Sequence, residues 1–155
     1  MKKRHINVEA VTPAPPEIVY GLLADGSTWP LWSAIDSVEL ETPGDPPPEG
    51  IGAIRVNRRG RTTGRDQILE LVPNRRLSYA TLSGLPIRDY VGEVDLAPAP
   101  GGGTTIYWHS SFFPKPRGTG WIMQAGLRRF LTQTANGLAE YAATKTGSDR
   151  NVTSP

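Results

Sequence analysis

The chain has 155 residues, a length typical of one domain, and it contains no cysteine. The lack of cysteine excludes disulfide bridges, thiolate metal sites and a cysteine nucleophile. Charged residues make up 21% and hydrophobic residues 37%, which is typical of a globular chain. No apolar run is long enough to span a membrane, and none follows the basic N-terminus as in a secretory signal, so we expect a cytoplasmic protein without membrane insertion.

The formal net charge is only +2, but the charges are unevenly distributed. Residues 51–88 carry eight arginines, whereas residues 1–50 carry eight acidic and three basic residues. A basic segment can indicate a nucleic-acid partner. Aromatic residues are not interleaved with these arginines as a single-strand binder would require, so we expect no nucleic-acid partner and interpret the arginines as solubilising groups of a sheet.

The first elements are a strand and two short helices. Residues 3–12 alternate apolar and polar side chains, which predicts a strand. Pro15-Pro16 can open a helix, because proline fits the first turn, and residues 18–23 then carry an apolar helical face. Asp25-Gly26-Ser27 ends this helix, and Ser27 can cap a second one that carries Trp29 and Trp32.

From residue 35 onward the apolar pattern has a period of two and is interrupted by turn residues. The candidate strands are 35–42, 51–59, 62–72, 75–83, 87–97 and 104–113. Connections this short predict an antiparallel meander. Residues 119–144 then predict one long amphipathic helix, and residues 145–155, which are polar and lack periodicity, are expected to form a flexible tail behind a single domain over 1–144.

This order of elements predicts an α+β fold, in which a curved seven-stranded antiparallel sheet wraps around the long C-terminal helix. Only that helix is long enough to cover the apolar face of the sheet. We expect an internal cavity of a few hundred cubic ångströms between them, open near the turn Gly84-Leu85-Pro86.

Several short segments carry a family resemblance. They are Ala-Pro-Pro-Glu-Ile-Val-Tyr at 14–20, Trp-Pro-Leu-Trp at 29–32, Gly-Ile-Gly-Ala-Ile-Arg at 50–55, Pro-Asn-Arg-Arg-Leu at 73–77 and Gly-Thr-Thr-Ile at 103–106. In this order, over about residues 4–144, the chain resembles the START/Bet v1-like (SRPBCC) superfamily and its polyketide cyclase/dehydrase branch, which implies a helix-grip fold. Members of that superfamily include aromatase/cyclases, lipid and hormone carriers and hormone receptors, so the resemblance implies a pocket without fixing a function.

Alternation along the predicted strands assigns side chains to the two faces of the sheet. In strand 104–113 the more apolar set includes Trp108 and should face the cavity, which leaves His109 outward and solvated. Gly92, on an inward position, marks either a bend or space for a ligand. In strand 62–72 Ile68 and Val72 compete with Leu69 and Leu71 for the inward face, and a bulge could shift the register.

Strand 51–59 allows two interpretations. Pure alternation places Ile54 and Val56 inside, whereas the family resemblance implies that Arg55 and Asn57 face the cavity. An inward Arg55 would suit a carboxylate or an enolate oxygen and would need a partner such as Asp66, Glu70, the Tyr79 hydroxyl or an acidic ligand. The alternative is a surface arginine.

No catalytic constellation is evident, so no catalytic residue is assigned. We expect neither a metal nor a cofactor, because the two histidines, His5 and His109, provide no ligand pattern. The remaining candidates are cavity-lining side chains, mostly aromatic or apolar. The predicted ligand-binding residues are Trp29, Trp32, Arg55, Tyr79, Tyr90, Trp108, Ser110, Phe112, Met123, Leu127, Phe130 and Leu131.

Three functions compete at this point. The first is a carrier or binding protein for a hydrophobic small molecule that is polyketide-, lipid- or steroid-like. The second is an aromatase/cyclase-like enzyme that uses cavity arginine and tyrosine groups. The third is an interaction module for a protein or an RNA. The sequence does not distinguish a monomer from a dimer.

Overall fold

The structure is a computed structural model that describes residues 2–115 and 118–153. In chain order its elements are β1 (Arg4–Thr12), α1 (Pro16–Ala24), η1 (Gly26–Thr28), α2 (Trp29–Trp32), β2 (Ser37–Thr42), β3 (Ile54–Arg59), β4 (Thr62–Val72), β5 (Arg76–Ser83), β6 (Ile87–Pro98), β7 (Thr104–Pro114) and α3 (Gly120–Thr153). The seven strands form one antiparallel sheet in the order β1-β7-β6-β5-β4-β3-β2. The predicted meander and helix-grip fold are thus confirmed.

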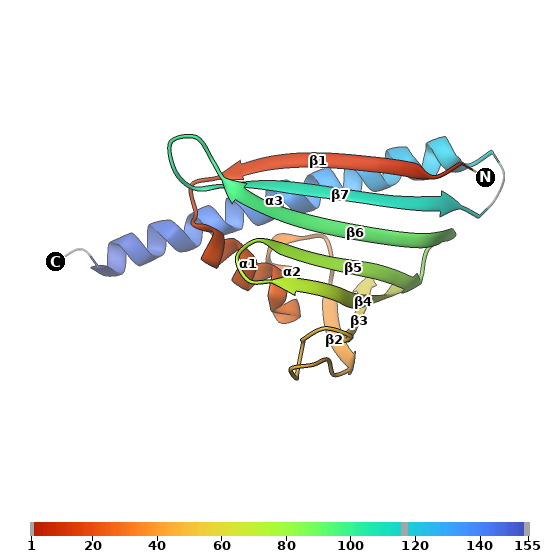
Figure 1. The fold of residues 1–155 in the computed structure, drawn as a ribbon, viewed down its shortest axis with the longest axis horizontal. Helices are drawn as coiled ribbons and strands as arrows, with labels where there is room; N and C mark the ends of the chain where they lie inside the picture. The colour runs from red at the N-terminus through yellow and green to blue at the C-terminus, as the bar shows by residue number, and fades with distance from the viewer. Residues whose placement is uncertain (1, 116–117, 154–155) are drawn as a thin grey trace.

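The long helix α3 lies across one face of this sheet, with α1 and α2 at its side (Figure 1). It is fastened to β1 by side chains, because Gln124 donates a hydrogen bond to the carbonyl oxygen of His5 at 2.8 Å. Further along the helix, the Thr12 hydroxyl donates to the carbonyl oxygen of Ala139 at 2.8 Å. None of the described helices is both long and apolar enough to span a membrane.

The buried face of α3 changes character along its length. Its first half presents Met123, Leu127, Phe130 and Leu131 to the sheet, whereas its second half buries Ala135, Leu138, Ala139 and Ala142. Small residues let the second half approach α1 and α2 closely, so the larger gap between helix and sheet lies under the first half. The helix also continues to Thr153, past residue 144 where its apolar periodicity ends, so the tail predicted from residue 145 is helical as far as it is described.

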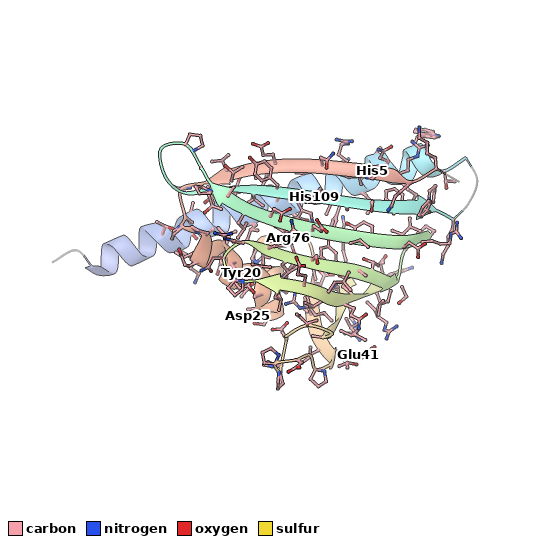
Figure 2. The ribbon with its side chains drawn as sticks, in the orientation of Figure 1. His5, Tyr20, Asp25, Glu41, Arg76 and His109 are labelled. Atoms are coloured by element: carbon pink, nitrogen blue, oxygen red, sulfur yellow. The ribbon has the colours of Figure 1, made fainter. Side chains whose placement is uncertain are left out.

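The face assignments made from alternation hold for the central strands. Ile106, Trp108 and Phe112 of β7 are fully buried, as are Val94 of β6 and Leu77 of β5. The face of the sheet turned away from α3, which we call the outer face, carries the polar residues of the same strands. His109 lies there, as predicted, on the side of the sheet opposite α3 (Figure 2).

A bulge in β4 decides which of its apolar residues face the core. The register against β5 shifts between Ile68 and Glu70, so that the intervening Leu69 is left out of the pairing and is exposed. Ile68 before the bulge is buried, and Leu71 after it packs against the core as well. A single bulge therefore brings residues of opposite parity to the same face.

Candidate ligand-binding cavity

A cavity of about 480 Å³ lies between the concave face of the sheet and the first half of α3. This volume lies within the range of small-molecule sites and matches the expectation from the sequence. Its lining on the sheet side comes from β3 to β7, and on the helix side from Ile122 to Thr134. Gly84 and Leu85 of the β5–β6 turn also belong to the lining, as does the exposed Ile122, and the mouth at this turn stays a prediction.

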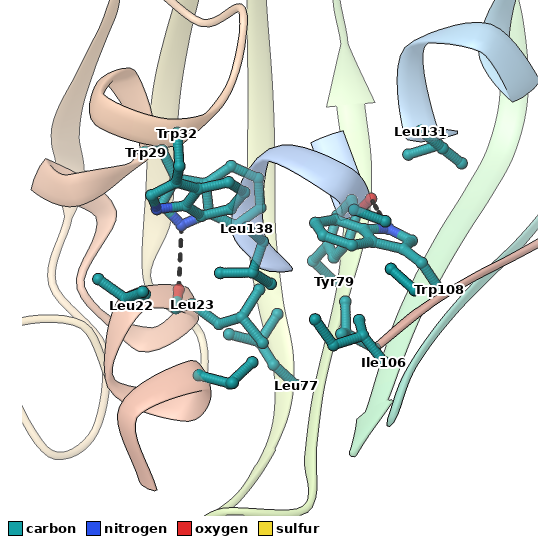
Figure 3. Close-up of a cluster of buried hydrophobic side chains, with 14 of the residues drawn as sticks. Leu22, Leu23, Trp29, Trp32, Leu77, Tyr79, Ile106, Trp108, Leu131 and Leu138 are labelled. Atoms are coloured by element: carbon teal, nitrogen blue, oxygen red, sulfur yellow. Dashed lines mark hydrogen bonds between the residues drawn. The ribbon is translucent and has the colours of Figure 1, made fainter. Parts of the chain in front are cut away.

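Most of the cavity wall is aromatic or aliphatic. The rings of Trp29 and Trp108 meet edge to face with centroids 5.8 Å apart, and Leu131 lies beside Trp108 in the same core cluster (Figure 3). Trp29 itself is held by a hydrogen bond of 3.1 Å from its indole nitrogen to the carbonyl oxygen of Leu23. A rigid wall of this kind suits a flat apolar ligand.

One corner of the cavity is polar and is formed by Asn57, Asp66 and Thr81, which we call the polar corner. The Thr81 hydroxyl donates to one carboxylate oxygen of Asp66 at 2.8 Å, and the Asn57 amide donates to the other at 2.5 Å. Burial raises the pKa of Asp66 to about 6, although both hydrogen bonds and the nearby charge of Arg55 lower it. Asp66 therefore titrates near neutral pH at the cavity wall.

Two tyrosines form a second polar feature of the wall. The indole N–H of Trp108 donates to the Tyr79 hydroxyl at 3.2 Å, and that hydroxyl lies 3.3 Å from the hydroxyl of Tyr90. Burial raises the pKa of both phenols, and the charge of Asp66 raises both further. They therefore stay protonated and act as hydrogen-bond donors or acceptors rather than as anions.

Arg55 is buried, as the family resemblance implied, but it does not line this cavity. Its Nε lies 2.9 Å from the Glu49 carboxylate, and its Nη2 donates to the carbonyl oxygen of Ala24 at 2.6 Å. A weaker bond joins Nη1 to the carbonyl oxygen of Leu23 at 3.3 Å. Arg55 thus caps the C-terminal end of α1, and its ion-pair partner is Glu49, which the sequence reasoning did not propose. Asp66, one of the proposed partners, acts on Arg55 through its charge without a direct ion pair.

The structure brings eight of the twelve predicted ligand-binding residues to the cavity wall. These are Trp29, Tyr79, Tyr90, Trp108, Met123, Leu127, Phe130 and Leu131. Trp32, Ser110 and Phe112 are also buried but lie in the core and not on the wall. Binding itself stays a prediction for all of them.

Sequence reasoning did not place the Asp66 carboxylate in the cavity, although a signal was present. Ile68 and Asp66 are two positions apart, and residues two apart on a strand share a face. Had Ile68 been taken as the inward residue of this strand, Asp66 would have followed. The apolar pair Leu69 and Leu71 suggested the opposite parity, and the sequence does not show that a bulge at Leu69 changes the parity.

Gly92 makes room for a side chain and not for a ligand. A Cβ atom at this position would overlap the ring of Tyr79, which fills the space opposite it on the neighbouring strand. The glycine therefore fixes the position of the Tyr79 hydroxyl. The contact with Tyr79 explains the glycine, so neither of the two explanations considered from the sequence, a bend or space for a ligand, is needed.

The outer face carries an ion-pair network around His109. Its Nε2 lies 2.7 Å from Asp95 and 3.6 Å from Glu93, and Arg76 binds the other oxygen of Asp95 at 2.6 Å. The possible ligand atoms of Glu93, Asp95 and His109 lie within 4.8 Å of one another. Because both Asp95 oxygens already have cationic or hydrogen-bonding partners, we interpret the group as a structural network.

The fold and its cavity define a protein of the helix-grip class with an internal site of small-molecule size. A model of the family described as polyketide cyclase/dehydrase and lipid transport matches residues 3–143. The chain therefore belongs to that family. A comparison with curated protein sequences gives no match.

Solved structures share the fold at low sequence identity. The Zhui aromatase/cyclase from Streptomyces sp. R1128 is 17% identical, with a TM-score of 0.78 over 94% of this chain and 96% of its own. Ara h 8.0201 is 17% identical, with a TM-score of 0.71 over 92% and 99%. The protein XoxI from Bacillus cereus is 14% identical, with a TM-score of 0.72 over 91% and 95%. At these identities the likeness shows the fold alone.

Proposed function

We propose that this protein is a cytoplasmic carrier or binding protein that holds a hydrophobic small molecule in the cavity under α3. The observation that carries the proposal is the 480 Å³ cavity with its aromatic and aliphatic wall. A well-packed core leaves no empty space of this size, and an apolar cavity of this volume suits a polyketide-, lipid- or steroid-like ligand. The family description, which includes lipid transport, supports the same class of ligand.

A cavity-filling substitution tests this proposal. Gly126 on α3 contributes to the cavity lining, and a Cβ there meets nothing within 4 Å, so Gly126→Leu should take up part of the cavity volume without strain. The neutral dye N-phenyl-1-naphthylamine should bind the native protein at one site per chain and should bind this variant more weakly. Gly21→Leu is the matched control, because Gly21 is a helical glycine of α1 with open space around it. Equal dye binding by all three proteins would contradict the proposal.

The polar corner favours a second candidate, an aromatase/cyclase-like enzyme. Asp66 is suited to accept a proton from a carbon between two carbonyl groups, and the Tyr79 or Tyr90 hydroxyl to donate a hydrogen bond to the resulting enolate oxygen. Arg55, the oxyanion group considered from the sequence, is occupied by Glu49 and the end of α1. Turnover of a linear poly-β-ketone to an aromatic product, followed by absorbance, tests this candidate; a carrier would bind the chain unchanged.

A further inference from the structure

Of the oppositely charged pair Arg55 and Asp66, the carboxylate lies on the cavity wall and the guanidinium does not. Arg55 and Asp66 are register partners on β3 and β4, but their side chains have different surroundings. The Arg55 charge is neutralised by Glu49 and by two backbone carbonyl groups. Among the described residues, the side chains that donate hydrogen bonds to Asp66 are the neutral ones of Asn57 and Thr81, and the charge of Arg55 acts on Asp66 without a direct ion pair.

The remaining surroundings of Asp66 contain few charges. The seven residues of α3 that line the cavity are all uncharged, and so are Trp29 and Ile35 from the α2 region. Tyr79 and Tyr90 on the adjoining strands stay neutral because burial raises their pKa values. The one cationic side chain on the cavity wall in the described residues is Arg59, which is exposed and lies over the Phe130 ring at 4.8 Å.

The two Asp66 oxygens are not saturated by these contacts. A carboxylate has about four acceptor positions, and the hydrogen bonds from Asn57 and Thr81 use two of them. A half-buried carboxylate with free acceptor positions, such as Asp66, gains from a donor on the ligand and is destabilised by a second carboxylate. Asp66 therefore makes the apolar cavity favour ligands with a hydrogen-bond donor over ligands with a carboxylate.

We propose that Asp66 is the recognition group of this cavity, binding a hydrogen-bond donor, such as a hydroxyl or an ammonium group, on an otherwise apolar ligand and disfavouring carboxylate ligands. This inference rests on the proposed function, because it requires that a ligand enters the cavity. It reverses the expectation from the sequence, in which a cavity-facing arginine would have favoured acidic ligands. Because the pKa of Asp66 is about 6, the preference strengthens as the pH rises through that value and the carboxylate ionises.

Three probes that differ in one group test the preference: 9-anthracenemethylamine, 9-anthracenemethanol and 9-anthracenecarboxylate, titrated by fluorescence. At pH 7.5 the native protein should bind the amine most tightly and the carboxylate least. Asp66→Asn should weaken the amine by about tenfold to a hundredfold, the scale of a hydrogen bond to a charged group, and should not weaken the carboxylate. At pH 5 the amine should lose most of its advantage in the native protein, while the charges of the probes are unchanged.

A control variant and a folding check show whether the effect belongs to Asp66 itself. Glu70→Gln removes a carboxylate from the same strand, but Glu70 pairs with Arg76 at 3.4 Å in the network of the outer face, so it should leave all three affinities unchanged. Circular dichroism should show that Asp66→Asn is folded. If the probes bind but Asp66→Asn leaves their order unchanged, the role of Asp66 is wrong and the cavity proposal stands. If no probe binds the native protein, both proposals are overturned.

Discussion

Arg55 and Asp66 are neighbours across two strands, yet one acts on the fold and the other on the cavity. Arg55 joins β3, the loop carrying Glu49 and the end of α1 through its ion pair and carbonyl contacts. The hydrogen bonds to Asp66 come from Asn57 and Thr81 on the cavity wall. At the scale of single residues, the structure therefore separates a stabilising cation from a cavity-facing anion.

Replacing Arg55 should cost stability and not ligand selectivity. Arg55→Ala leaves the largely buried Glu49 carboxylate without its cation and the carbonyl group of Ala24 without its side-chain donor, so we expect a loss of about 2–4 kcal/mol in the free energy of unfolding. Urea unfolding measures this loss. Arg58→Ala is the control, because the Arg58 side chain is 45% exposed in its pair with Glu39 and should change stability by less than about 0.5 kcal/mol. Similar small losses for both would show that Arg55 is not a fold-stabilising residue.

Asp66 should make the folded protein sensitive to pH. Its carboxyl keeps a proton up to about pH 6 in the folded chain, against a usual value of 3.8, so unfolding between these values releases a proton. Its contribution to stability therefore falls as the pH rises from about 4 to about 6. At about 1.4 kcal/mol per pKa unit, Asp66→Asn should be more stable than the native chain by about 1–3 kcal/mol at pH 8 and nearly equal to it at pH 4.

Urea unfolding at the two pH values measures this difference. Glu70→Gln, which removes a carboxylate of the same strand from the outer face, should show no comparable dependence. A constant difference between Asp66→Asn and the native chain at both pH values would mean that Asp66 ionises in the folded state as it does in water.

At the scale of elements, the contact between α3 and α2 depends on a glycine. A Cβ atom at Gly137 would overlap the carbonyl oxygen of Trp32, so the two helices touch only because that side chain is absent. Gly137→Ala should therefore lower stability by about 1–3 kcal/mol, although alanine is the better helix former. Thermal unfolding measures the effect. Gly126→Ala on the same helix, where the added Cβ meets nothing, should raise stability by about 0.5–1 kcal/mol, and a gain at both positions would contradict the close contact.

The strands also show how far the sequence predicts this structure. Strict alternation in β7 correctly assigned Trp108 inward and His109 outward, because the strand pairs on both sides without interruption along that stretch. In β4 the same reasoning did not decide which side chains face the cavity, since the bulge at Leu69 changes the parity. The sequence pattern could not predict the partner of Arg55 either, because Glu49 lies in a loop whose position depends on tertiary contacts. The fold was therefore predictable, whereas the polarity of the cavity was not.

At the scale of the whole molecule, the two halves of α3 pack differently. Behind the cavity the small residues of α3 pack against α1 and α2, and over the cavity the larger residues of α3 leave a space above the sheet. The packed half fixes the helix, while the half over the cavity begins with the exposed Trp121 and Ile122. This division explains how one small domain combines a stable core with an unfilled interior.

The central claim is that the interior of this domain binds an apolar ligand, and nuclear Overhauser effects between ligand and protein test it most directly. With N-phenyl-1-naphthylamine added to isotope-labelled protein, we predict contacts from the ligand to the methyl groups of Met123, Leu127 and Leu131 on the cavity wall. Contacts confined to exposed side chains such as Val11 and Leu31, or no contacts at saturating ligand, would contradict the claim.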